Sequence, residues 1–189
     1  MVSFLRELWV PILLAGVLCF IVSTLAWMVF THHRSEWHRL PTESDVLEAL
    51  RKDMPPPGLY AFPFAMRGEA ERADVKAAYE RGPVGYLTIA NRHRPNVPGM
   101  ATAMLAYFIV VSFCIGYVAW AAAPAPKFGA PEIHTARITW TVALLAYAAS
   151  SFADSVWFAR PWRAYVAQFI DAALYATVTA AVFVEFWPQ

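Results

Sequence analysis

The chain has 189 residues, of which 59% are apolar and only 15% are charged, and its formal net charge is +1. Ordinary soluble domains carry about 45–50% apolar and about 25% charged residues, so the composition argues against a soluble protein. The small net charge indicates no nucleic-acid partner. The two cysteines, Cys19 and Cys114, lie in apolar stretches without the spacing of a zinc site or a disulfide framework.

Four long apolar segments predict membrane-spanning helices, at residues 8–30, 100–123, 136–158 and 163–187. A helix that crosses a hydrocarbon core of about 30 Å needs about 20 apolar residues. Backbone groups in lipid must be paired within their own segment, so these runs are expected to be helices. The expected fold is an all-α membrane protein with four transmembrane helices. The first apolar run is too long for a signal peptide and is expected to remain as an anchor.

The polar stretch between the first two apolar segments, residues 31–98, is expected to form a small cytoplasmic α+β insert. Thr42 and the acids after it predict the start of a helix that a run of prolines ends. A second short helix is expected over 69–81, with short strands over 59–62 and 84–90. Because a helix separates the two strands, the sequence allows a parallel pair. An insert of this size buries little apolar surface by itself. It is therefore expected to rest on the membrane helices or the lipid headgroups.

The basic residues predict the orientation in the membrane. Twelve of the 15 lysines and arginines lie in the insert or in the turn at 159–163. Cytoplasmic loops of membrane proteins carry an excess of Lys and Arg, so this side is expected to face the cytoplasm. Both chain termini then lie in the periplasm, and the expected location is a bacterial inner membrane, with the lipid bilayer as the first partner.

Two acids inside the apolar segments are the leading candidates for a functional site. Asp154 precedes Arg160 and Asp171 follows Arg163, so both are expected about 9–12 Å inside the cytoplasmic boundary, on neighbouring antiparallel helices. Intramembrane acids usually face the bundle interior or a wet cavity. If the two carboxyls meet, they share a proton. Alternatively, Asp154 reaches the boundary, and Asp171 bonds across helices as a neutral acid, with Tyr175 as a further candidate.

Small residues recur at every fourth position in the last two apolar segments. One series is Ala146, Ser150 and Asp154, and another runs from Ala172 to Ala180. Such spacing lets membrane helices approach closely. A tightly packed hairpin of these two helices is therefore expected.

A histidine-rich stretch follows the first apolar segment. His32, His33, Arg34 and His38 lie at its cytoplasmic end, at the expected level of Asp171 or just above it. Imidazoles with carboxylates form a ligand set for transition metals. However, adjacent histidines point to different faces of a helix, and no HxxxH or HExxH pattern is present. An anchor among the lipid headgroups is the alternative, and the sequence assigns neither a metal nor any other cofactor.

Five stretches spread over most of the chain carry a family resemblance: His32–Pro41, Asp45–Arg51, Pro57–Pro63, Gly82–Val84 and Ser155–Tyr175. In this order they resemble segments of a group of bacterial four-helix integral membrane proteins that has no assigned activity. The resemblance implies an inner-membrane protein with an outward N-terminus and a cytoplasmic insert. It also implies an amide at position 154 and an acid at position 171 in related chains, which favours Asp171 over Asp154.

Three functions fit these features. The first is an accessory or scaffold subunit of a membrane complex that binds a protein partner or forms a homo-oligomer. The absence of nucleophile and phosphate-loop motifs fits that role better than an enzyme. The second is a proton- or cation-linked transport module centred on Asp171. The third is a metal-binding membrane protein that uses His32 and His33 with Asp154 and Asp171.

Overall fold

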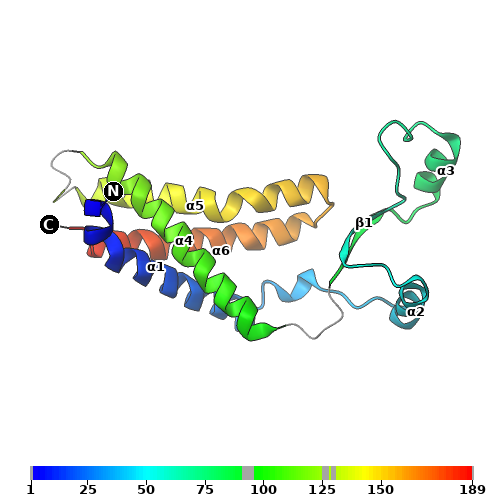
Figure 1. The fold of residues 1–189 in the computed structure, drawn as a ribbon, viewed down its shortest axis with the longest axis horizontal. Coiled ribbons are helices and arrows are strands. Elements are labelled where there is room, and N and C mark those ends of the chain that lie inside the picture. Colours follow the sequence, from blue (N-terminus) through cyan, green and yellow to red (C-terminus); the bar gives the residue numbers. More distant parts are fainter. Residues whose placement is uncertain (1, 91–95, 125–127, 129–130, 189) are drawn as a thin grey trace.

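The computed structural model describes residues 2–90, 96–124, 128 and 131–188. These residues form a bundle of long helices and a smaller insert that projects from one end of it (Figure 1). The long helices are α1 (Val2–Met28), α4 (Val97–Ala122), α5 (Glu132–Trp157) and α6 (Trp162–Glu185). Both chain termini lie at the end of the bundle opposite the insert.

Three of the described helices are long and apolar enough to cross a membrane: most of α1, from Phe4 to Met28, and all of α4 and α6. Helix α5 has a similar length, but its threonines, serines and Asp154 make it too polar to meet the same criterion. The structure is therefore mostly helical and compatible with a membrane protein. Length and composition identify three spans rather than the four expected.

The helices of the bundle approach closely where small residues meet. Helices α5 and α6 form an antiparallel hairpin, and Ala148 of α5 and Ala176 of α6 are buried in the bundle core. Helix α1 packs against α4 and α6. A Cβ atom built on Gly16 of α1 would lie only 2.9 Å from the Cα atom of Ile109 on α4. Glycine therefore allows this close approach of two helix backbones.

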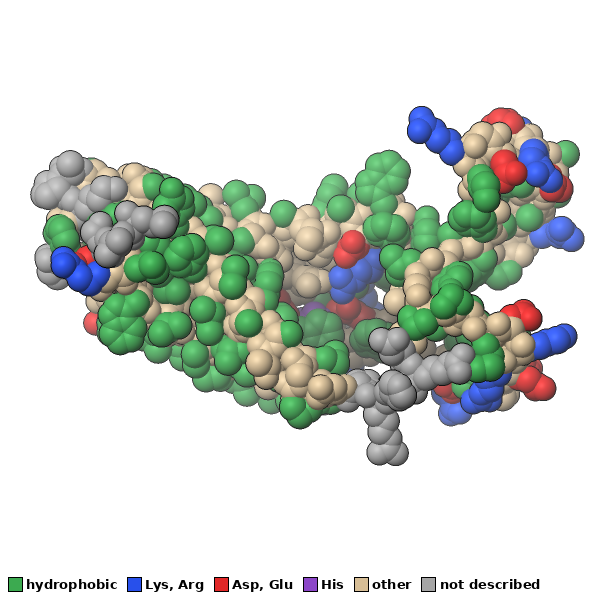
Figure 2. Space-filling view, viewed as in Figure 1, with side chains coloured by type: hydrophobic (Ala, Val, Ile, Leu, Met, Phe, Trp, Pro, Cys, Tyr) green, Lys and Arg blue, Asp and Glu red, His purple; other side chains and the backbone are tan. Residues whose placement is uncertain are grey.

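The bundle is apolar both inside and outside. Its core contains large buried side chains from all four long helices: Leu8, Phe108, Tyr147 and Phe183. Its outer surface exposes a further set of large apolar side chains, and Figure 2 shows them over most of the visible face of the bundle. Charged side chains gather mainly on the insert. An apolar surface of this extent fits contact with lipid rather than with water.

The insert contains a short 3-10 helix, two α-helices and two strands. They are η1 (Arg34–Glu36), α2 (Glu43–Asp53), β1 (Gly58–Phe62), α3 (Ala73–Arg81) and β2 (Gly85–Ile89). The described residues of α2 and α3 include no buried side chain. Thr42 precedes α2 as expected, but its side chain makes no capping hydrogen bond.

The strands pair antiparallel, from Gly58 opposite Ile89 to Phe62 opposite Gly85, and not in the parallel arrangement that the sequence allowed. A parallel pair needs a connection that returns to the end where the first strand began. Here the connection with α3 folds into a lobe beyond the far end of the hairpin (Figure 1). The Tyr79 hydroxyl donates to the Pro63 carbonyl at 3.2 Å and holds the lobe beside the end of β1.

The insert touches the bundle near the turn between α5 and α6. The rings of Tyr86, on β2, and Phe158, after α5, meet edge to face with their centroids 5.6 Å apart. This contact agrees with the expectation that the insert rests on the helices. The greater part of the insert, including α2 and α3, projects away from the bundle (Figure 1).

Candidate metal centre

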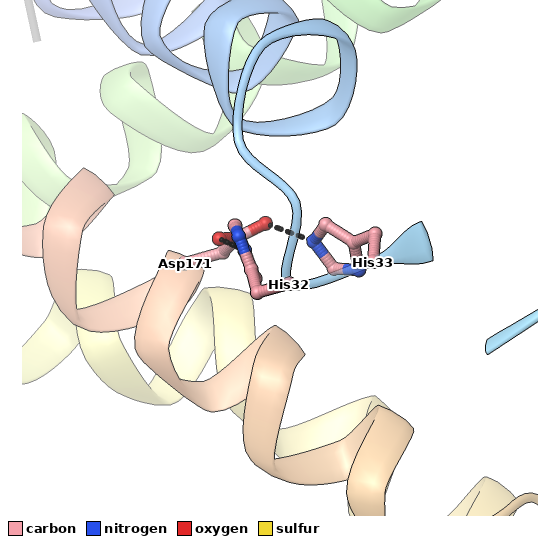
Figure 3. A group of neighbouring side chains, drawn as sticks. All are labelled: His32, His33 and Asp171. Atoms are coloured by element: carbon pink, nitrogen blue, oxygen red, sulfur yellow. Dashed lines mark hydrogen bonds and ion pairs between the residues drawn. The ribbon is translucent and has the colours of Figure 1, made fainter. Parts of the chain in front are cut away.

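The chain that leaves α1 turns back toward the bundle. Helix α1 ends at Met28, two residues before the predicted end, and is followed by a turn and the 3-10 helix. Because His32 and His33 are not in an α-helix, their side chains are not held about 100° apart, as neighbours in a helix would be. Both imidazoles point to Asp171 on α6 (Figure 3). This turn removes the objection that adjacent histidines face different ways.

Asp171 lies at the centre of the site and is almost completely buried, with 3% of its surface exposed. The Nε2 atom of His32 lies 2.8 Å from Oδ1 of Asp171, and Nε2 of His33 lies 2.9 Å from Oδ2. The Tyr175 hydroxyl, one helical turn along α6, donates to Oδ2 at 3.3 Å. One ligand atom each from His32, His33 and Asp171 lie within 4.8 Å of one another.

A second layer of side chains holds His33 in place. Its Nδ1 atom contacts the carboxylate of Glu36, whose other oxygen accepts from Nη2 of Arg160 at 3.3 Å. Nη1 of Arg160 donates to the Gln168 side chain at 2.8 Å. On one face, the Trp27 ring stacks on the His33 imidazole with the centroids 3.9 Å apart and the planes 6° from parallel. The site therefore joins the segment after α1, the turn after α5, and α6.

His33 lies between two carboxylates. A neutral imidazole has one N–H donor and one bare nitrogen, whereas an ionised carboxylate only accepts hydrogen bonds. The contacts of Nδ1 with Glu36 and of Nε2 with Asp171 are therefore both favourable only if the group holds one extra proton or cation. The group contains two buried carboxylates, and the guanidinium of Arg160 pairs with the carboxylate of Glu36 alone, so an additional positive charge near Asp171 balances the group.

The other predicted site residues lie outside this group. Asp154 lines a separate pocket between the strands and the α5–α6 turn, with Tyr60 and Phe158 among its neighbours. Among the described residues, no hydrogen bond joins Asp154 to Asp171. Arg34, His38 and Arg163 are exposed, whereas Arg160 contributes to the site through Glu36.

Sequence reasoning missed three residues of the site: Glu36, Gln168 and Trp27. Glu36 follows His33 by three residues, and Gln168 precedes Asp171 by three, a spacing that puts helical neighbours on one face. These spacings are common, and they become informative only when Asp171 and His33 are known to meet. Trp27 is equally suited to the membrane interface, so its stacking on His33 has no signal in the sequence.

A cavity of about 380 Å³ adjoins the site on its inner side. Asp171, Tyr175 and Gln168 line one part of it, and Ser23 and Tyr147 lie farther along its wall. Figure 2 shows a hollow between the bundle and the insert, with histidine visible inside it and acidic and basic side chains beside it. Asp171 therefore faces both the histidines and an internal space with several hydroxyl groups.

Comparison with protein-family models, with curated proteins and with solved structures finds no match to this chain. The geometry around Asp171 is therefore the basis for the functional assignment.

Proposed function

We propose that this protein is a membrane-embedded binding protein for a divalent transition-metal ion, held by His32, His33 and Asp171. The observation that carries the proposal is the position of His33 between the carboxylates of Asp171 and Glu36. That arrangement needs an additional proton or cation. The convergence of a second imidazole on the same carboxylate favours a metal ion as the species that meets this need.

The ligand set is suited to such an ion. Imidazole nitrogens with a carboxylate bind zinc and other first-row metals, and three protein ligands leave coordination positions open for water or a further ligand. The ring of His33 and the carboxyl group of Asp171 are buried, and the ring of His32 is partly exposed. The site is thus enclosed on the side of α6 and accessible on the side of His32.

Glu36 strengthens this interpretation. A histidine that binds a metal usually donates its second ring N–H to a carboxylate, which orients the ring and raises its basicity. Glu36 accepts from Nδ1 of His33 in this way, leaving Nε2 of the same ring free to bind an ion beside Asp171. Arg160 neutralises the Glu36 carboxylate, so the orienting group itself is stable when buried.

We infer further that α5 is a fourth transmembrane helix. Its polar side chains Thr139, Ser151 and Ser155 are buried in the bundle, whereas Leu145 and Phe152 are exposed on its outer face. A helix that is polar inside and apolar outside suits a lipid surface despite its moderate overall hydropathy. With four spans, both termini are periplasmic in a bacterial inner membrane, the insert is cytoplasmic, and the metal site lies at the cytoplasmic end.

Metal analysis of the purified protein tests the proposed function. After equilibration with Zn²⁺ in mild detergent, the wild-type chain is expected to retain one ion, and Asp171→Asn and His33→Gln are expected to lose it. Asp154→Asn and His38→Gln are matched controls, because these residues lie outside the site. A wild-type protein without bound zinc, or controls that lose it equally, would reject the proposal.

A cation-linked transport module centred on Asp171 is the second candidate, favoured by the cavity that continues from Asp171 toward the middle of the bundle. Uptake of Zn²⁺ or protons into proteoliposomes would test it. Transport is expected to be lost in Asp171→Asn and retained in Asp154→Asn. Uptake that is equal in these two variants would rule the role out.

A scaffold role is favoured by the surface of the insert. Between α2 and β2 lies a cavity of about 560 Å³ with an apolar wall, formed by residues that include Leu47, Leu50, Leu87 and Ile89. Such a groove is suited to a protein partner or to another copy of the chain. Pull-down of a defined partner by the wild type, but not by Leu50→Glu, would support it. A monomer that isolates alone would argue against it.

A further inference from the structure

The middle of the bundle contains a polar cluster to which each long helix contributes one side chain. These residues, which we term the polar node, are Cys19 of α1, Ser112 of α4, Tyr147 of α5 and Thr179 of α6. The Cys19 sulfur lies 3.3 Å from the Thr179 hydroxyl, and its thiol donates to the Tyr175 carbonyl at 3.6 Å. All four side chains are buried.

Two hydroxyls of the node have no hydrogen-bond partner among the described residues: those of Ser112 and Tyr147. The Tyr147 hydroxyl faces Ser112 and Thr179 without reaching a direct hydrogen bond. Buried polar groups are rarely left without a partner, and internal water commonly bridges those that lack a direct one. Buried hydroxyls that lie near one another without direct hydrogen bonds are therefore suited to be bridged by water.

The cavity beside the site reaches the node at one residue, Tyr147. The cavity of about 380 Å³ is lined by Asp171 and Tyr175 at one end and by Tyr147 of the node, with Ser23 also in its wall. Its volume is sufficient for several water molecules, each of which occupies about 30 Å³ in the liquid. Thr179 follows Asp171 by eight residues on α6, so the node lies about 12 Å deeper in the bundle.

The next layer of the bundle closes this space. A Cβ atom built on Gly116, one turn beyond Ser112 on α4, would lie 3.0 Å from the Phe183 ring and 3.3 Å from the Ile12 side chain. Ile12 and Phe183 are buried in the core. This apolar layer lies on the side of the node toward the chain termini and leaves little room for water.

We propose that the polar node is the inner end of a water-filled vestibule. The vestibule opens at the Asp171 end of the bundle and is closed toward the other face by Ile12, Gly116 and Phe183. It brings water, and with it protons or a hydrated cation, to the middle of the membrane. This inference goes beyond metal binding, since the ligand of the node is water and none of its residues is a proposed metal ligand.

The thiol of Cys19, which belongs to the polar node, provides a test of the vestibule. In the Cys114→Ser background Cys19 is the remaining cysteine, so its reaction with a small water-soluble probe, Ag⁺, can be followed. Membrane vesicles of both orientations are treated with Ag⁺, and the surviving thiol is labelled with a maleimide after denaturation. A protease added outside the vesicles cleaves the insert only where the insert faces outward, which identifies the orientation of each vesicle preparation. Because thiol modification follows access to solvent, Cys19 is expected to react quickly only in the vesicles whose insert faces outward.

Two buried positions provide controls, each one helical turn from a node residue toward the apolar layer that closes the vestibule. Ala15→Cys on α1 and Ala143→Cys on α5, each combined with Cys19→Ser and Cys114→Ser, place a thiol where the residue is fully buried. The second control is used if the first does not fold. Cys19 is expected to react on the order of tenfold faster than either, because reactivity falls when water is excluded. Equal rates, or equal reaction from both faces, would overturn the vestibule.

The proposed vestibule and the proposed metal site can be rejected independently of each other. The His33→Gln variant, which is expected to lose zinc, is expected to keep the fast reaction of Cys19, because the cavity is lined by other residues. Conversely, Ser112→Val is expected to slow the reaction of Cys19 while zinc binding persists. Slow reaction of Cys19 in a chain that retains one zinc ion would reject the vestibule alone.

Discussion

His33 and Asp171 meet across 138 residues of sequence, with Nε2 of the imidazole 2.9 Å from Oδ2 of the carboxylate. This contact joins the segment after α1 to a buried position on α6. It also places the imidazole between Asp171 and Glu36, so the three side chains together require one more proton or cation. Replacing individual members of the group should therefore have different effects on metal binding and on folding.

Glu36→Gln is expected to weaken zinc binding by about 10–100-fold without abolishing it, the usual effect of removing a residue that orients a metal ligand. The amide keeps the size of the side chain and loses the charge that His33 and Arg160 face. Isothermal titration in detergent measures the change. Asp154→Asn makes the same chemical change outside the site and is expected to leave the affinity unaltered. An unchanged affinity in Glu36→Gln would show that Glu36 does not act on the metal through His33.

Asp171→Ala is expected to lower the free energy of unfolding by about 3–5 kcal/mol, the usual cost of removing one partner from a buried charged pair. The change leaves both imidazoles and the Tyr175 hydroxyl without their shared acceptor. Unfolding in detergent without added metal measures the loss separately from zinc binding. Asp154→Ala removes a partly exposed acid and should cost far less. Equal losses of unfolding free energy in Asp171→Ala and Asp154→Ala would mean that the buried position of Asp171 adds nothing specific to stability.

Gly16→Val is expected to destabilise the contact of α1 with α4 by about 1–3 kcal/mol, because added side-chain atoms in a packed interface force neighbouring groups to move. The first added carbon would already lie 2.9 Å from the backbone of Ile109. Val17→Leu adds bulk at the next residue, on the exposed face of α1, and is the matched control. Thermal unfolding of both variants checks the prediction. If Gly16→Val unfolds at the same temperature as the wild type, α1 and α4 can move apart to admit the added side chain.

Tyr86→Ser is expected to release the strand hairpin from the bundle, since the ring contact with Phe158 is lost. Hydrogen exchange in β1 and β2 should become faster, while exchange in α5 and α6 and the zinc affinity remain the same. Val84→Ser removes an exposed apolar side chain just before β2 and controls for changed hydrophobicity. Unaltered exchange in Tyr86→Ser would show that the insert is held by other contacts.

The helical character of the chain and its apolar segments can be predicted from the order of its residues alone. Hydrophobic run length is a local property, so residues 8–30, 100–123 and 163–187 correspond closely to helices α1, α4 and α6. Residues 136–158 correspond to α5 by position, but the polar residues that face the bundle keep its hydropathy below that of a clear span. The short helices and strands of the insert were likewise predicted near their observed positions.

Which of these residues meet depends on the three-dimensional fold. Asp171 and Asp154 have similar depth in the sequence pattern, but α6 turns Asp171 toward the end of α1, whereas Asp154 faces the strands. The early end of α1 at Met28 lets two adjacent histidines reach one carboxylate. The antiparallel pairing of β1 and β2 likewise depends on the path of the segment with α3 that connects them. Such contacts depend on the path of the chain between distant elements, which local patterns of residue type do not encode.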